Sequence, residues 1–272
     1  MPDFLDEMAG SSAARARTLA GRSGELLAAA ERTELPLPLV SSDFGVIAEI
    51  KPRAPSAGHL GAVDIGACAQ RARAYATGGA ACVSVLTEPS RFDGSLDHLA
   101  AIARVLRAHD VPAMRKDFLV DPLQIAEARI AGASGVLLIA RMLDDVRLGE
   151  MIHAAQSLRL FAIVEAFDEV DLARSAHAIA SSPARLLVGV NCRDLTTLQI
   201  DRARLLSLAQ YLPTGVDAVA ESGLETEDDV GAVVRAGYRA ALIGTSLMRA
   251  LDPTARVRAL TDAGLRVARE AS

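Results

Sequence analysis

The sequence predicts an α/β protein, a single (β/α)8 TIM barrel with a helical extension at its N-terminus. Eight short apolar runs recur along the chain, and several of them lack polar alternation, which is typical of parallel strands that are buried on both faces. Amphipathic stretches of helical length lie between the runs, and successive runs begin 23 to 35 residues apart. Eight consecutive βα units favour a closed barrel.

Each apolar run is a predicted strand, and each is followed by a predicted helix. The strands are 46–50, 81–86, 112–114, 135–140, 160–164, 186–190, 217–220 and 240–243. The helices are 64–77, 96–108, 122–131, 144–157, 168–178, 202–212, 226–236 and 253–271. Pro122 and Pro253 stand where a first helical turn tolerates proline, and Asp64, Asp144 and Thr226 suit the N-cap position.

The chain divides into an N-terminal segment, residues 1–43, and a barrel segment, residues 46–270, of one domain. The first segment predicts one or two extra helices between Leu5 and about Glu31. Gly78, Gly132 and Gly237 each close a helix shortly before a strand, as glycine C-caps do. An open doubly wound sheet is the alternative fold, but no GxGxxG motif follows the first strand.

The amino-acid composition argues against several classes of protein. The 272 residues are 51% hydrophobic and 3% aromatic without tryptophan, and the net charge is −5, so a basic or aromatic nucleic-acid surface is not expected. Three widely spaced cysteines indicate neither disulfides nor a zinc site, and no metal site is predicted. Acidic residues near the N-terminus and the lack of a long apolar run argue against a signal peptide and a membrane span. We therefore expect a cytoplasmic protein.

Polar side chains end several of the predicted strands. They are Glu49 and Lys51, Lys116, Glu165, Asn191 and Arg193, and Glu221. The carboxyl ends of barrel strands share one rim, where barrel enzymes carry their active sites. One charged residue at a strand end is usually solvated or in a structural ion pair. Two lysines and three carboxylates converging on one rim favour acid–base catalysis, because burying such charges is costly.

Small residues follow the last two strands. Ser222 and Gly223 come after Glu221, and Gly244 and Thr245 come after Ile243. Either pair alone could be an ordinary tight turn. In barrel enzymes, however, backbone N–H groups of the loops after strands 7 and 8 commonly hold a phosphate. Together the two turns predict a phosphate site.

Short strings of residues recur in a fixed order from about residue 46 to residue 249. The strings are IAEIK at 47–51, PS at 55–56, SVLTE at 84–88, FDGS at 92–95, RKDF at 115–118, VDP at 120–122, QI at 124–125, VE at 164–165, GVNCRDL at 189–195, ESG at 221–223, LIG at 242–244 and SLM at 246–248. In this order they resemble indole-3-glycerol phosphate synthases.

This resemblance implies a reaction of tryptophan biosynthesis. The substrate, 1-(2-carboxyphenylamino)-1-deoxyribulose 5-phosphate, closes a ring and loses CO2 and water to give indole-3-glycerol phosphate. No cofactor is implied, and the only expected partner is this phosphorylated small molecule. We expect a monomer or a weak homo-oligomer.

The resemblance also implies roles for individual residues. Lys116 matches the general acid that protonates the ribulose carbonyl, and Lys51 matches a lysine near the substrate carboxylate. Glu165, helped by Glu49, matches the acid and base of dehydration. The other matches are Asn191, Arg193 and Glu221 as orienting polar groups, Ser56, Ser222, Gly223, Gly244 and Thr245 around the phosphate, and Phe92 and Phe118 as walls for the anthranilate ring.

Three alternatives are weighed against this assignment. The first loop departs from the family pattern, with Ala57 where a lysine is usual, which is compatible with a paralogue that makes indole-3-glycerol phosphate or an analogue for specialised metabolism. A catalytically silent barrel predicts loss of Lys116, Glu165 or Asn191, and all three are present. Phosphoribosylanthranilate isomerase would need a cysteine base near the end of the first strand, where Glu49 stands.

Overall fold

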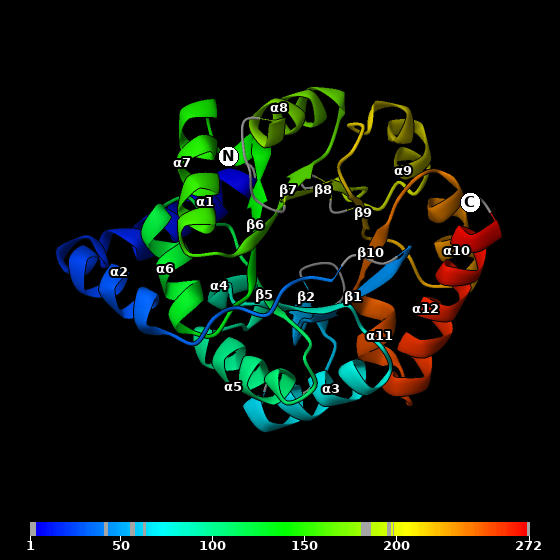
Figure 1. Ribbon diagram of the computed structural model, residues 1–272, viewed down its shortest axis with the longest axis horizontal. Coiled ribbons are helices and arrows are strands. Elements are labelled where there is room, and N and C mark those ends of the chain that lie inside the picture. Colours follow the sequence, from blue (N-terminus) through cyan, green and yellow to red (C-terminus); the bar gives the residue numbers. More distant parts are fainter. Residues whose placement is uncertain are drawn as a thin grey trace.

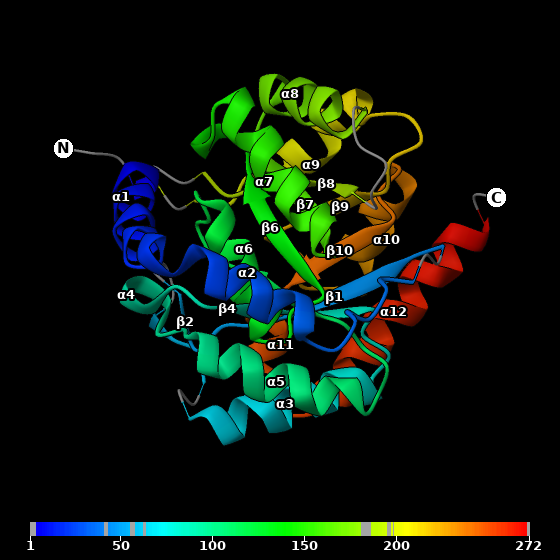
Figure 2. The same cartoon turned by 60° about the vertical axis from the view of Figure 1, so that its left-hand side comes forward.

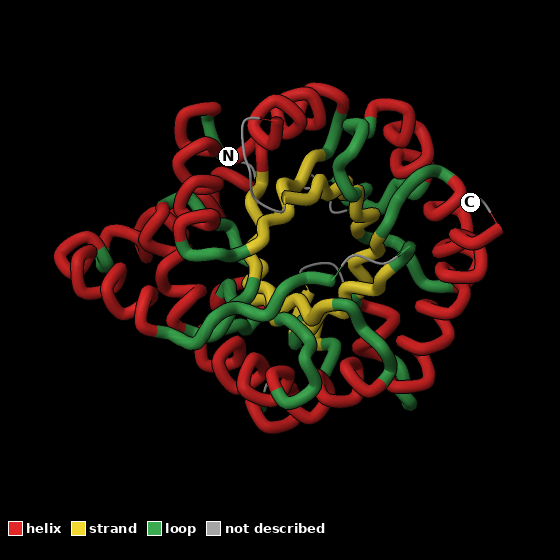
Figure 3. The backbone as a smooth tube through the Cα atoms, viewed as in Figure 1, coloured by secondary structure: helices red, strands yellow, loops and turns green. Residues whose placement is uncertain are grey.

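A computed structural model describes residues 4–40, 43–54, 58–61, 64–180, 186–194, 197 and 199–270. Its main sheet is built from β1 (Gly45–Ile50), β4 (Cys82–Leu86), β5 (Ala113–Lys116), β6 (Gly135–Ile139), β7 (Phe161–Ala166), β8 (Leu186–Asn191), β9 (Ala218–Glu221) and β10 (Ala240–Ile243). All neighbouring strands are parallel, and the order β1-β10-β9-β8-β7-β6-β5-β4 closes on itself. Figures 1 and 3 show this ring of strands inside a ring of helices. The predicted TIM barrel is confirmed.

The outer ring follows the predicted helices closely. It contains α3 (Ile65–Thr77), α5 (Leu96–Arg107), α6 (Pro122–Ile130), α7 (Asp145–Ser157), α8 (Glu169–Ala180), α9 (Ala203–Leu208), α10 (Glu227–Arg235) and α12 (Pro253–Glu270). Asp64, Asp144 and Thr226 accept backbone N–H bonds as N-caps, as predicted. Gly78 is the C-cap of α3, as predicted, with φ of −74°, and the left-handed residue is the next one, Gly79.

Several short elements were not predicted. They are the hairpin β2 (Arg53–Ala54) and β3 (Gly58–His59), the short helices α4 (Pro89–Phe92) and α11 (Thr245–Arg249), and the 3-10 turn η2 (Ala140–Met142). Two further 3-10 turns lie within predicted helical segments: η1 (Ala20–Arg22) between α1 and α2, and η3 (Ala209–Tyr211) at the end of the predicted helix 202–212. Elements of two to five residues are too short to show a hydrophobic period. The first turn of α4 instead depends on Glu88, whose carboxylate accepts the N–H groups of Ser90 and Arg91 at 2.9 and 2.7 Å.

The strands alternate between two apolar clusters. Val46, Ala48 and Ile50 of β1 pack outward with the helices, whereas Ile47 packs inside the barrel. The same period of two recurs on the other strands. At their carboxyl ends the inward positions are polar, and they form the site described below.

The N-terminal extension forms α1 (Phe4–Arg17) and α2 (Ser23–Arg32), as predicted. In Figure 2 both helices lie along the outside of the barrel, with α2 crossing in front of α6. Phe4 packs on Phe118, just beyond the carboxyl end of β5. The linker after α2 reaches the opposite end of the strands, where the Leu37 N–H bonds to the Ser134 hydroxyl at 3.0 Å, just before β6. None of the helices described is both long and apolar enough to cross a membrane.

Candidate active site

A cavity of about 250 Å³ opens at the carboxyl ends of the barrel strands. Every predicted site residue that the structure describes lines this cavity. These residues are Glu49, Lys51, Phe92, Lys116, Phe118, Glu165, Asn191, Arg193, Glu221, Ser222, Gly223, Gly244 and Thr245. Ser56 lies outside the described residues. The topology therefore gathers the candidates from seven strands and their loops into one place.

Lys116 is the centre of the polar floor. Its ammonium group lies 3.2 Å from Oε1 of Glu165 and 3.1 Å from Oε2 of Glu221, and both carboxylates are almost fully buried. Burial alone would lower the pKa of Lys116, but the charges of Glu165, Glu221 and Glu49 outweigh it and raise the pKa above its usual value. The lysine is thus charged, and its ammonium group is held at a defined position.

Glu221 is a buried carboxyl group whose pKa is raised. Burial and the neighbouring Glu165 raise its pKa to about 8, against the opposing effect of Lys116. Its buried Oε1 has no hydrogen-bond partner among the described residues. A group with this pKa is mostly protonated near neutral pH, so it adds little negative charge beside the Lys116 ammonium group.

Gly189 makes room for this arrangement. It stands beside Glu165 in the sheet register, and a Cβ atom at this position would lie 2.2 Å from Oε1 of Glu221 and 2.9 Å from Ile163. No heavy-atom contact of this kind is tolerated at 2.2 Å. Glycine is therefore required here for close approach, although its backbone conformation is ordinary.

We expect Gly189→Ala to lower kcat by about 10- to 100-fold, because the added methyl group pushes the Glu221 carboxyl group away from Lys116 by the order of an ångström. Steady-state kinetics of the purified variant measure this effect. Gly149→Ala on α7 is the matched control, since nothing lies within 4 Å of its Cβ position, and it should keep wild-type kcat. Wild-type kcat in Gly189→Ala would contradict the role of this cluster.

Glu49 and Lys51 form a second pair on β1 and just after it. The lysine Nζ lies 2.8 Å from Oε1 of Glu49. Burial alone would raise the pKa of Glu49. The positive charges of Lys51, Lys116 and Arg193 have the larger effect and lower the pKa below its usual value, so the group stays ionised. Gly244 approaches this carboxylate so closely that a Cβ would lie 2.8 Å from Oε1. Gly244 thus has a spatial reason to be glycine besides the predicted phosphate contact.

Asn191 donates to the same oxygen of Glu165 that Lys116 contacts. Its amide Nδ2 donates to Oε1 of Glu165 at 2.8 Å, and its Oδ1 accepts the backbone N–H of Arg193 at 2.9 Å. Asn191 and Glu221 are direct partners in the β8–β9 register. The asparagine therefore holds the carboxylate in one orientation and anchors the start of the next loop.

Three aromatic rings form one wall of the cavity. The rings of Phe92 and Phe118 lie 6.0 Å apart, and Phe4 of α1 meets Phe118 edge to face at 5.8 Å. Phe92 and Phe118 were predicted as ring walls, whereas Phe4 was not. Its only sequence signal is an aromatic residue at the start of an amphipathic helix, which does not reveal where that helix packs.

Ser222, Gly223 and Thr245 line the cavity beside Arg249. Ser222 and Gly223 both have left-handed backbone, with φ of 73° and 71°; a Cβ on Gly223 would also lie 2.6 Å from Ile200. Arg249, at the end of α11, is a cation that the sequence analysis missed. This part of the cavity combines tight turns with a positive charge, as an anion site requires.

The distribution of lysine supports a chemical role for the floor. The whole chain contains two lysines, Lys51 and Lys116, and its remaining basic side chains are arginines apart from histidine. Guanidinium groups serve surface charge and ion pairs as well as ammonium groups do, but they do not release a proton near neutral pH. Both ammonium groups of lysine in this protein therefore lie where proton transfer is expected.

The cysteines lie apart from this chemistry. Cys192 is buried and donates a weak bond to the Ser222 carbonyl at 3.4 Å, and burial raises its pKa to about 11. A thiol with a raised pKa is a poor nucleophile. Within the described part of the chain, no group of three or more His, Cys, Asp or Glu side chains is arranged to hold a metal ion.

Comparison with known proteins decides the family. The family model for indole-3-glycerol phosphate synthase matches residues 28–260. The chain belongs to the indole-3-glycerol phosphate synthase family. The enzyme of this name from Mycobacterium ulcerans (strain Agy99) is 42% identical over 244 residues, covering 88% of this chain and 86% of the relative. That from Mycolicibacterium smegmatis (strain ATCC 700084 / mc(2)155) is 43% identical over 221 residues, covering 81% and 78%. Membership gives the chain the activity of a carboxy-lyase in tryptophan biosynthesis.

Solved structures agree on the fold of this synthase family member. A 3-hexulose-6-phosphate synthase from Salmonella typhimurium matches with a TM-score of 0.62 at 12% identity, covering 82% of this chain and all of that chain. A thiamine phosphate pyrophosphorylase from Pyrococcus furiosus matches with a TM-score of 0.59 at 14% identity, covering 83% and 97%. At these identities the similarity concerns the barrel alone.

Proposed function

We propose that this chain performs the synthase reaction with Lys116 as general acid and Glu165 as the acid and base of dehydration. The observation that carries the proposal is the Lys116 ammonium group, 3.2 and 3.1 Å from two buried carboxyl groups at the floor of the cavity. The same cavity is lined by the rings of Phe92 and Phe118 and by the turns beside Arg249. A substrate that carries an aromatic ring and a phosphate group fits these surroundings.

Ring closure comes first in the proposed mechanism. The ring carbon that carries the carboxylate attacks the ribulose carbonyl carbon, and Lys116 donates a proton to the carbonyl oxygen, which becomes a hydroxyl group. Positive charge develops on the ring nitrogen in this step, and the carboxylates of Glu49 and Glu165 stabilise it. Loss of CO2 then returns its bonding electrons to the ring, which restores aromaticity.

Dehydration completes the product. The new hydroxyl group leaves as water after taking a proton, and the neighbouring ring carbon gives up a proton, so the step needs both an acid and a base. Glu165 is held by Asn191 and Lys116 beside the place where this hydroxyl forms. We assign Glu165 to this exchange, with Glu49 in support, while Asn191, Arg193 and Glu221 orient the participants.

The two ends of the substrate set its direction in the cavity. The anthranilate ring packs against Phe92 and Phe118, and Lys51 binds its carboxylate. Ser222, Gly223, Gly244 and Thr245 hold the phosphate in the loops after β9 and β10. Ser56 is assigned to the same phosphate on the family resemblance. We expect the enzyme to work in the cytoplasm, as a monomer or weak homo-oligomer and without a cofactor.

Inorganic phosphate is expected to compete with the substrate and to raise the apparent KM without changing kcat. Gly244→Val should raise KM by about tenfold or more, the equivalent of one lost charge-assisted hydrogen bond. It should also weaken inhibition by phosphate. The added side chain meets Glu49 as well, so kcat falls in this variant too. If phosphate does not compete and Gly244→Val leaves KM unchanged, the anion site lies elsewhere.

The direct test is turnover of 1-(2-carboxyphenylamino)-1-deoxyribulose 5-phosphate by the purified protein. The chain has no tryptophan, so indole fluorescence that develops during the assay comes from product. Rescue of a tryptophan auxotroph separates the primary pathway from a paralogue of specialised metabolism. Failure to convert this substrate would overturn the proposal.

A further inference from the structure

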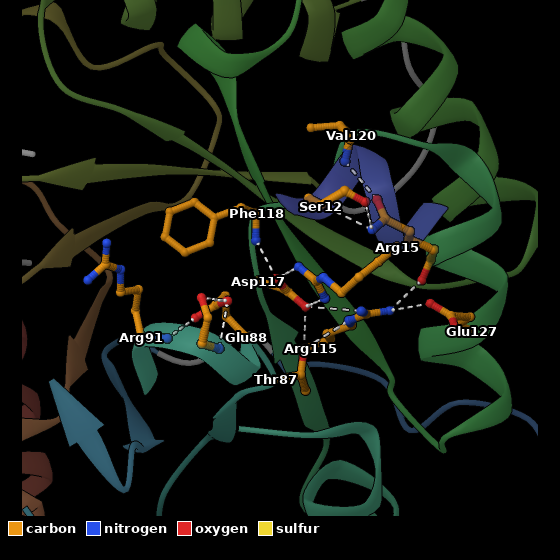
Figure 4. A network of polar contacts seen from close by, with 12 residues as sticks. Ser12, Arg15, Thr87, Glu88, Arg91, Arg115, Asp117, Phe118, Val120 and Glu127 are labelled. Carbon is orange, nitrogen blue, oxygen red and sulfur yellow. Dashed lines mark hydrogen bonds and ion pairs between the residues drawn. The ribbon is translucent and has the colours of Figure 1, made fainter. Parts of the chain in front are cut away.

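The outer side of β5 carries a buried ionic network that the proposed mechanism does not use. Arg115 and Asp117 flank Lys116 in the sequence, and their side chains contact each other at 3.0 Å. Both are almost fully buried. Figure 4 shows this pair with Thr87 of the neighbouring strand and with Arg15 of α1. A buried network of this kind needs a reason, because desolvating several charges is costly.

Asp117 is the hub of the network. One carboxylate oxygen accepts from Arg15 at 2.8 Å, from Thr87 at 2.7 Å and from Arg115 at 3.0 Å. The other accepts from Arg15 at 2.7 Å and from the Phe118 backbone N–H at 2.8 Å. Burial would raise the pKa of Asp117, but Arg15 and Arg115 lower it well below its usual range. The hub is therefore a permanent anion.

The backbone around Lys116 is held by these contacts. Arg115 donates from Nε to the Thr87 hydroxyl at 3.0 Å and from Nη1 to the Gln124 carbonyl at 2.9 Å. The Thr87 backbone N–H bonds to the Lys116 carbonyl at 3.0 Å. Lys116 thus stands between two anchored residues, which limits where its side chain can begin.

Arg15 belongs to a different part of the chain, 102 residues before Asp117. It lies near the carboxyl end of α1, and its guanidinium group grips the carboxylate with two bonds. The Gln124 amide, which donates to the Ser12 hydroxyl at 2.9 Å, joins the same helix to the first turn of α6. At the other end of α1, Phe4 lies against Phe118 in the cavity wall. One helix therefore contacts both the aromatic wall and the anchor of Lys116.

We propose that Arg15 is a positioning residue, which acts through Asp117 to hold the end of β5 and so to aim the Lys116 ammonium group at the reacting carbonyl. The packing of α1 beside the cavity and the position of the Lys116 ammonium group then both depend on the Arg15–Asp117 ion pair. This inference rests on the proposed function, because it gives Arg15 a role in the step assigned to Lys116.

Arg15→Ala tests the inference. The variant leaves Asp117 paired with Arg115, Thr87 and the Phe118 N–H, so we expect it to fold. Kinetics at saturating substrate should show kcat lowered by about 10- to 100-fold, the cost of misplacing a catalytic group by about 1 Å. Arg15→Lys keeps the positive charge but loses the paired geometry of the two guanidinium bonds, so it should give an intermediate kcat. Arg17→Ala, an exposed change on the same helix, should behave as wild type.

Two comparisons separate positioning from mere docking of α1. Phe4→Ala removes the ring contact but not the ion pair, so it should raise KM more than it lowers kcat, whereas Arg15→Ala should lower kcat more than it raises KM. In a double-mutant cycle, Arg15→Ala added to Asp117→Asn should have little further effect on kcat, because both act through one carboxylate. If Asp117→Asn does not fold, the kcat values of Arg15→Ala and Arg15→Lys decide between positioning and docking.

The outcomes distinguish this inference from the proposed function. If the wild type does not convert the carboxyphenylamino sugar phosphate, the proposed function fails. If the wild type is active and Arg15→Ala has the wild-type kcat, the positioning role is overturned and the proposed function stands. The same holds if Arg15→Ala raises KM without lowering kcat. Circular dichroism and thermal unfolding of each variant ensure that kcat is compared between folded proteins.

Discussion

Lys116→Met is expected to lower kcat for indole-3-glycerol phosphate formation by about 10²- to 10⁴-fold. Methionine has nearly the shape of lysine but no proton to donate, so the ribulose carbonyl would have to accept electrons without an acid. Glu221, which already holds a proton near neutral pH, stays neutral when the ammonium is removed, so two unpaired anions do not face each other. We therefore expect the barrel to fold and substrate affinity to stay within a few-fold.

A companion variant separates proton donation from charge. Lys116→Arg keeps a cation between Glu165 and Glu221, but a guanidinium group does not give up its proton at neutral pH. If Lys116 acts as the acid, this variant should be nearly as slow as Lys116→Met. Steady-state fluorescence kinetics and substrate titration measure kcat and affinity for each variant. Recovery of kcat in Lys116→Arg would instead mean that the charge alone is needed.

The barrel and its catalytic rim were predictable because both depend on local pattern and simple topology. Apolar runs of three to six residues separated by helical stretches specify parallel strands. The period of two then places Glu49, Glu165 and Glu221 on inward positions near the strand ends. A charged side chain inside an otherwise apolar strand is rare enough to mark the site. Closure of the barrel alone then brings these residues together at one rim.

Other parts of the site depend on contacts that no local pattern encodes. The pairing of Arg15 with Asp117 joins residues 102 positions apart, and amphipathicity shows that α1 buries one face but not what that face meets. Three consecutive charged residues at 115–117 would ordinarily indicate solvent exposure, yet Arg115 is 1% exposed. Gly189 carries no sequence signal for its role, since only the structure places Glu221 against it.

Glu165→Gln is expected to make dehydration the slow step and to lower indole formation by about 10²- to 10⁴-fold. Glutamine keeps the length of the side chain and can still accept a bond from Asn191 through its amide oxygen. Glutamine cannot take up or release a proton. The hydroxyl group formed by ring closure therefore has no proton donor at this position and leaves as water only slowly. Ring closure and loss of CO2 keep their acid, Lys116, with Glu221 as a neighbour at 3.1 Å. Glu49 still stabilises the positive charge on the ring nitrogen, so these two steps should slow much less than dehydration.

Rapid-mixing measurements of the two products decide between the steps. In Glu165→Gln, CO2 should be released in a burst close to one equivalent per enzyme, while indole fluorescence rises slowly from the start, because a ring-closed hydroxyl intermediate accumulates. Glu169→Gln, an exposed change on α8, is the control and should release both products together at the wild-type rate. If CO2 and indole slow down equally in Glu165→Gln, Glu165 acts at or before ring closure, and the division of labour with Lys116 is wrong.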